Sequence, residues 1–196
     1  MVIEEILKEL VSKDYQRFGD LWRNIRRVYD YRKDTSNSPP GFENTIVDIV
    51  ASLILERLPE RSRLLIRQKV KEFSKQPDLS FYSEATSLPK EVAEFKVVAG
   101  TSLNYFLYEN GQPSKGEGDF FWLAEASTKF QNITFLGVLL NVDIKDNTNT
   151  FLKKLEGKLK AEGKDNVKID IENIGTLGEL CTIYLVRFTP SSPPAP

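Results

Sequence analysis

The stretch ITFLGVLLNVDIK, residues 133–145, is dominated by apolar residues and predicts a β-strand. Side chains alternate between the two faces of a strand, so Asn141, Asp143 and Lys145 are expected to share one face. The apolar residues between them are expected to point to the opposite face. The end of this strand therefore presents an acid, one spacer residue and a lysine on the same polar surface.

The sequence around this strand predicts the rest of a mixed sheet. An aromatic-rich stretch, residues 119–127, is expected to form the preceding strand. Residues 150–163 carry the apolar period of a helix, and the segments 167–171 and 180–188 predict two further strands. The second half of the chain, residues 89–188, is therefore expected to hold a mixed sheet with a ββαββ-like order.

The first 75 residues follow a helical pattern instead. Apolar residues recur every three to four positions over 3–11 and 15–29, and the mostly apolar stretch 42–58 predicts a central buried helix. A further helix is expected to begin at Pro59, because the first turn of a helix tolerates proline. We therefore expect an α+β fold in which a unit of about four helices, residues 1–75, packs beside the sheet.

Three segments join or flank these two units. Residues 76–88 are polar and rich in serine, and we expect them to be a connector. Residues 89–100 predict a helix, whereas the aromatic-rich run 103–109 fits either a strand or a continued helix. The proline-rich end of the chain, residues 189–196, is expected to be disordered.

The composition excludes several common kinds of catalytic site. The 196-residue chain contains no histidine and a single cysteine, Cys181. Nucleophiles activated by histidine, histidine general bases and zinc sites built from thiolates are therefore excluded. Carboxylates and lysines remain as the reactive side chains.

Charge and hydropathy indicate the class of protein. The chain has 27 Lys and Arg against 28 Asp and Glu, so no overall field attracts nucleic acid or an anionic membrane. The most apolar stretch, residues 46–58, is too short and too charged to span a bilayer. The acidic N-terminal residues lack the pattern of a signal peptide. We expect a soluble cytoplasmic protein with no membrane partner.

The first functional hypothesis is a non-enzymatic interaction or regulatory module. It rests on the lack of a competent catalytic set and on a cluster of basic residues in and beside the expected fourth helix. This helical face would dock a protein partner, without a cofactor, through Arg57, Arg61, Arg63, Arg67 and Lys71. The alternative interpretation of the same cluster is a solvated helix face.

The second hypothesis is a Mg²⁺-dependent nuclease that uses Asp119, Asp143 and Lys145. The two carboxylates would lie on neighbouring strands and could hold Mg²⁺ through their oxygen atoms. The lysine would position a water molecule or stabilise charge on a phosphate. Nucleic acid is expected as a partner under this hypothesis only. The alternative is an amphipathic strand whose polar face meets water.

This set of an acid followed by an acid-x-lysine resembles the PD-(D/E)xK restriction-like nuclease superfamily. The resemblance covers about residues 89–172 and extends to the expected order of elements. That order is a helix bearing Glu91 and Glu94, a possible strand at 103–109, the strand opened by Asp119, the acid-x-lysine strand, a helix and a strand. The resemblance implies a metal-dependent reaction on a phosphodiester.

Overall fold

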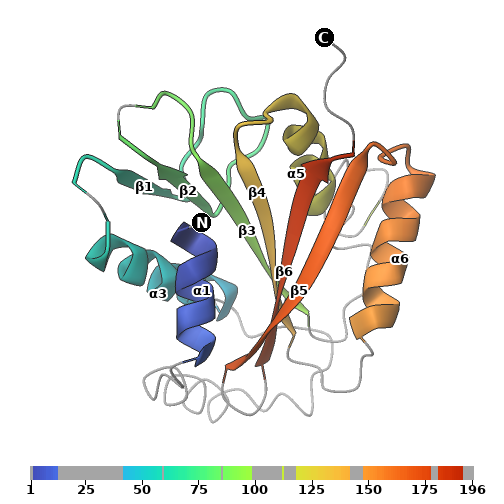
Figure 1. Cartoon of the computed structure of the whole chain (residues 1–196), viewed down its shortest axis with the longest axis horizontal. Helices are drawn as coiled ribbons and strands as arrows, with labels where there is room; N and C mark the ends of the chain where they lie inside the picture. Colours follow the sequence, from blue (N-terminus) through green and yellow to red (C-terminus); the bar gives the residue numbers. More distant parts are fainter. Residues whose placement is uncertain are drawn as a thin grey trace.

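The computed structural model shows a six-stranded mixed sheet with helices on both of its faces (Figure 1). It describes residues 2–12, 42–58, 60–84, 86–98, 112, 118–141, 148–177 and 181–191. The helices in these ranges are α1 (Val2–Ser12), α3 (Phe42–Glu56), α5 (Asp119–Lys129) and α6 (Thr148–Ala161). The strands are β1 (Arg63–Ile66), β2 (Leu79–Tyr82), β3 (Glu91–Val98), β4 (Thr134–Asn141), β5 (Val167–Leu177) and β6 (Cys181–Pro190).

The strand order in the sheet is β1-β2-β3-β4-β6-β5. The first three strands pair antiparallel with one another, and β4 then pairs parallel with β3. A parallel pair needs a crossover connection, and α5 lies in the segment that joins β3 to β4. The last strand, β6, lies between β4 and β5 and pairs antiparallel with both. The central strand β3 therefore has an antiparallel neighbour on one side and a parallel neighbour on the other.

Helices cover the two faces of the sheet with separate apolar cores. The core under α1 and α3 includes Ala93 and Phe95 of β3, whereas the core under α5 and α6 includes Val92. Alternation along β3 therefore puts Glu94 and Lys96 on the α5 face, in line with Val92. This face carries the polar site described below.

A glycine in β4 allows α5 to approach the sheet closely. A Cβ atom added at Gly137 would lie 2.7 Å from Cζ of Phe120, in the first turn of α5. No side chain fits in that space without a shift of the ring or the strand. Gly137 is also the residue of β4 that pairs with Glu94 of β3. The N-terminal end of α5, with Asp119, is therefore held close to Glu94.

The α+β fold class agrees with the structure, and several elements lie where the sequence predicts them. The expected helices over 3–11, 42–58 and 150–163 correspond to α1, α3 and α6. The strand expected at 133–145 begins as β4, and β5 and β6 overlap the last two expected strands. The helices are not all N-terminal, because α5 and α6 follow β3 and β4.

Three predicted elements are wrong. The helix expected from Pro59 is replaced by the short strand β1 and a loop, and the helix expected over 89–100 is the strand β3. The strand expected over 119–127 is the helix α5. In addition, β2 lies within the expected connector 76–88. Pairing within the sheet decided β1, β2 and β3, and such pairing overrides local propensity.

Several expectations lie outside the described residues. They are the helix over 15–29, the run 103–109 and most of the proline-rich end. The division of the chain into domains stays a prediction. Among the helices of the described ranges, none combines the length and the apolar character needed to cross a bilayer.

Candidate functional site

Two acids meet where β2 begins beside β3. Leu79 of β2 pairs with Ala93 of the antiparallel β3, and continuing this register by one residue places Asp78 opposite Glu94. The backbone N–H of Phe95 donates a hydrogen bond of 2.8 Å to Oδ2 of Asp78. Sheet pairing and this hydrogen bond therefore fix the Asp78 carboxylate beside the Glu94 side chain.

Glu94 is a buried acid, with only 5% of its surface exposed. Burial raises its pKa well above the ordinary value, and the nearby carboxylates of Asp78 and Asp119 raise it further. Lys96 opposes this rise, whereas a side-chain hydrogen bond between Glu94 and Asp78 adds to it. The two carboxyl groups are therefore close enough to share a proton when no cation lies between them.

Lys96 lies two residues after Glu94 on the same face of β3. Its Nζ is 2.8 Å from Oδ2 of Asp119 and 3.5 Å from Oε1 of Glu43 in α3. Burial lowers the pKa of Lys96, but the charges of Glu43, Asp119 and Glu94 outweigh burial and the net shift is upward. Lys96 is therefore an ammonium ion at neutral pH.

Asp119 joins this cluster from the first turn of α5. Its Oδ1 atom is 3.4 Å from Nζ of Lys75, in the loop before β2. Burial raises the pKa of Asp119, but Lys96 and Lys75 outweigh that effect and the net shift is downward. The Asp119 carboxylate is therefore ionised and is held between two lysines.

Arg67 lies beside Asp78 and also contacts α3. Its guanidinium donates to the Asn44 carbonyl oxygen at 3.0 Å and to Oδ1 of Asp48 at 3.3 Å. The Nε atom lies 3.7 Å from Oδ1 of Asp78, which is an ion-pair distance. These contacts fix the guanidinium against α3 and place a positive charge beside the Asp78 carboxylate.

The predicted catalytic residues have different outcomes. Asp119 lies at this cluster, although it opens a helix and not a strand. Asp143 and Lys145 lie outside the described residues.

Sequence reasoning missed Asp78, Glu94 and Lys96. The signal was present, because the chain reads Pro77-Asp78 and then Glu94-Phe95-Lys96. The local pattern predicts a connector over Asp78 and a helix over Glu94 and Lys96. In a helix, residues two apart do not face each other, so the acid-x-lysine spacing loses its meaning there.

The basic residues predicted to dock a partner do not form one helical face. Arg63 lies on β1, and the other four lie in turns and loops. Four of the five have partners in the fold: Arg57 with Glu9, Arg61 with Glu84, Arg63 over the Tyr82 ring and Arg67 with Asp48. Lys71 is exposed. The docking hypothesis stays a prediction, but the helical surface on which it relied is not present.

Within the described ranges, no group of three or more His, Cys, Asp and Glu side chains is arranged to hold a metal ion. Any cation at this site would therefore need water or substrate oxygens beside Asp78 and Glu94. Comparison with known proteins identifies no relative. No protein-family model, no curated protein and no solved structure matches the chain significantly.

Proposed function

We propose that this protein is a Mg²⁺-dependent nuclease in which Asp78 and Glu94 hold the cation and Lys96 stabilises charge on the phosphate. The contact between the Asp78 and Glu94 carboxyl groups, with Lys96 beside them on β3, carries the proposal. The reaction is that of the second hypothesis from the sequence, whereas the residues assigned to it here differ from Asp119, Asp143 and Lys145.

The donor atoms suit Mg²⁺. This ion prefers oxygen ligands and is usually bound by one or two carboxylates, with water and substrate phosphates completing its coordination. A pair of acids is therefore sufficient, and a cage of three or more is not required. The raised pKa of Glu94 also favours a cation at this position, because a cation placed between the two acids would relieve their repulsion.

When bound, Mg²⁺ would lower the pKa of a coordinated water and neutralise charge on the phosphate. Lys96 is protonated at neutral pH, so it donates hydrogen bonds and positive charge and does not act as a general base. Asp119 and Glu43 hold its Nζ atom near the two acids. The fold thus orients the lysine before any substrate arrives, which lowers the cost of reorganisation.

The motif itself supports this assignment. The sequence matches the pattern that gives the PD-(D/E)xK nucleases their name, with the proline and first acid at Pro77-Asp78 and the second acid and lysine at Glu94-Phe95-Lys96. These residues come from two adjacent strands of one sheet, and the side chains of Glu94 and Lys96 share a face.

Cleavage of supercoiled plasmid and of a labelled duplex oligonucleotide tests the proposal. We expect cleavage with Mg²⁺ or Mn²⁺ and none in EDTA. Asp78→Asn, Glu94→Gln and Lys96→Gln should each reduce the rate on the order of 100-fold or more. Asp170→Asn, which removes an exposed carboxylate on β5, is the matched control and should keep the rate.

Asp143→Ala separates the two assignments of the nuclease site. Activity that survives this change but not Glu94→Gln supports the site proposed here. Activity that survives both Asp78→Asn and Glu94→Gln overturns it, as does the absence of cleavage by the unchanged protein with either metal.

A further inference from the structure

The loop between β1 and β2 carries a local excess of positive charge. Residues 67–76, which we call the basic loop, contain Glu72 as their one acid against four basic residues, Arg67, Lys69, Lys71 and Lys75. The whole chain has a net charge of −1, so any attraction for a polyanion must come from such a local surface.

Two apolar anchors fix the basic loop to the body of the protein. Val70 and Phe73 are each only 3% exposed and belong to the core under α5. The Phe73 ring packs edge-on against Trp122 of α5 and Phe130, with centroid distances of 5.6 Å and 5.3 Å. The loop therefore presents its charges from a defined position.

Hydrogen bonds within the basic loop close it on itself. The side-chain amide of Gln76 donates to the Arg67 carbonyl oxygen, which joins the two ends of the loop. The Nζ atom of Lys69 donates to the Ser74 carbonyl oxygen at 2.7 Å. The side chains of Lys69 and Lys71 are both exposed. These two lysines, with the exposed Glu72 beside Lys71, form the outer, solvent-facing charge of the loop.

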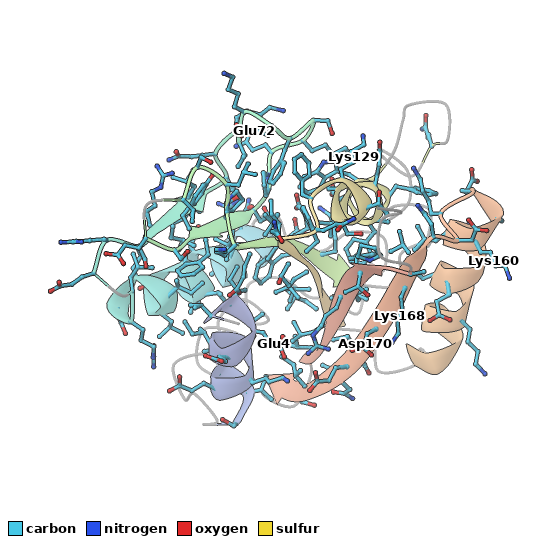
Figure 2. The ribbon with its side chains drawn as sticks, turned by 45° about the horizontal axis from the view of Figure 1, so that its top comes forward. Glu4, Glu72, Lys129, Lys160, Lys168 and Asp170 are labelled. Carbon is cyan, nitrogen blue, oxygen red and sulfur yellow. The ribbon has the colours of Figure 1, made fainter. Side chains whose placement is uncertain are left out.

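The ends of the basic loop lie at the proposed active site. The backbone N–H of Arg67 donates to the Asp78 carbonyl oxygen at 2.9 Å, and Lys75 contacts Asp119. Figure 2 shows Glu72, next to Lys71, projecting at the edge of the molecule on the same side as Lys129 of α5. The basic loop is therefore anchored at both of its ends to residues of the proposed site.

We propose that Lys69 and Lys71 bind the phosphate backbone of duplex DNA beside the point of cleavage. This inference rests on the proposed nuclease function and names its substrate. Duplex DNA carries a charge for about every 1.7 Å of its axis, so two exposed lysines on one loop can each meet a phosphate. Each contact displaces condensed counterions and makes affinity depend on salt.

The test measures binding of a fluorescent duplex by anisotropy in EDTA, where cleavage cannot proceed, from 50 to 200 mM salt. The double variant Lys69→Gln/Lys71→Gln is compared with Lys160→Gln/Lys168→Gln. The control pair is exposed on α6 and β5, at the far side of the molecule in Figure 2. Lys71→Gln alone leaves the hydrogen bond of Lys69 intact and checks that the loop keeps its fold.

We expect the loop double variant to bind roughly tenfold or more weakly at 100 mM salt. The slope of log affinity against log salt is negative and should become less steep by about 0.9 for each lysine removed. Equal affinity and slope in the loop and control variants would overturn the inference. The inference would also be overturned if the unchanged protein bound a single strand of the same length with the same affinity and salt slope as the duplex.

Cleavage with Mg²⁺ in the same preparations separates this inference from the proposed function. If the protein cleaves DNA but the loop variant binds DNA as well as the control variant does, binding through Lys69 and Lys71 is refuted and the nuclease function stands. Loop-dependent binding without cleavage supports the surface and refutes the nuclease.

Discussion

The ammonium group of Lys96 lies 2.8 Å from the carboxylate of Asp119, so the first turn of α5 holds the lysine of β3. Under the proposed function Asp119 does not need to touch the phosphate, because it sets the position and charge of Lys96. We describe it as a positioning residue. Its removal should change the pH dependence of cleavage and not only the rate.

Asp119→Asn should lower cleavage roughly 10- to 100-fold, as loss of a supporting partner commonly does. The acidic limb of the pH profile should move to lower pH, because Asp119 raises the pKa of Glu94 and the ionised acid is needed. A rate–pH curve recorded from pH 5 to 10 checks this shift, and a uniform loss of rate without it would indicate a structural role alone.

Glu94→Gln should stabilise the fold at pH 8 while it abolishes cleavage. The pKa of Glu94 is higher in the folded protein than in the unfolded chain. The fold therefore loses stability as pH rises from the unfolded pKa towards the higher folded pKa. A tenfold difference in proton affinity between the folded and unfolded states corresponds to about 1.4 kcal/mol. Glutamine stays neutral and can still donate a hydrogen bond to Asp78.

Urea denaturation of the wild-type protein and of Glu94→Gln at pH 4 and pH 8 measures this effect. The two proteins should be similar at pH 4, and the variant should be the more stable at pH 8. A variant that is less stable at pH 8 would show that the Glu94 carboxylate is not destabilised by its surroundings.

Gly137→Ala should destabilise the fold by about 1–3 kcal/mol, because the new methyl group meets the Phe120 ring at 2.7 Å. Gly157→Ala is the matched control within α6. A Cβ there meets nothing within 4 Å, and alanine in a helix interior is favoured over glycine by about 1 kcal/mol. Denaturation midpoints should therefore move in opposite directions, and a tolerated Gly137→Ala would refute the close packing of α5 on β4.

Glu4→Gln should lower the free energy of unfolding at pH 7 by about 3 kcal/mol, because the buried Glu4 carboxylate pairs with Arg187 at 2.6 Å. Burial raises the pKa of Glu4, but hydrogen bonds from Arg187 and Lys8 outweigh it and the net shift is downward. This stability is therefore present above the unfolded pKa of about 4.3 and is lost as pH falls through the lower folded value.

Denaturation of both proteins between pH 7 and pH 2.5 should show the difference shrinking only below about pH 4.3. Asp170→Asn removes an exposed partner of the same arginine and should cost no more than about 1 kcal/mol. A difference for Glu4→Gln that is constant down to pH 2.5 would mean that the lowered pKa plays no part.

The parts of the fold that could be predicted from sequence are those whose local pattern matches their environment. The helix α6 has one apolar stripe, and Gly163 follows it with a φ of +75°, a backbone conformation that glycine adopts readily. The strand β4 is a long apolar run with β-branched and aromatic residues. In both cases local propensity and packing agree.

The strand β3 and the helix α5 could not be predicted in this way. Val92, Ala93 and Phe95 are all fully buried, because β3 is covered on both faces, and its apolar pattern therefore fits a helix as well as a strand. Most of α5 is buried against the sheet, which removes the polar stripe that would identify a surface helix.

The site depended on these elements. Asp78 and Glu94 are brought together by the register of β2 against β3, which no local pattern contains. The motif was nevertheless visible as Pro77-Asp78 and Glu94-x-Lys96. Recognising it required Glu94 and Lys96 to lie on a strand, where alternate residues share a face.

Binding of Mn²⁺ followed by electron paramagnetic resonance tests the central claim most directly. We expect the wild-type protein to bind Mn²⁺ more tightly at pH 8 than at pH 6, because the cation displaces the proton shared by the two acids. Asp78→Asn and Glu94→Gln should abolish this binding, whereas Asp170→Asn should retain it. Mn²⁺ binding that persists unchanged in Glu94→Gln, or that is absent from the wild-type protein, would contradict the account.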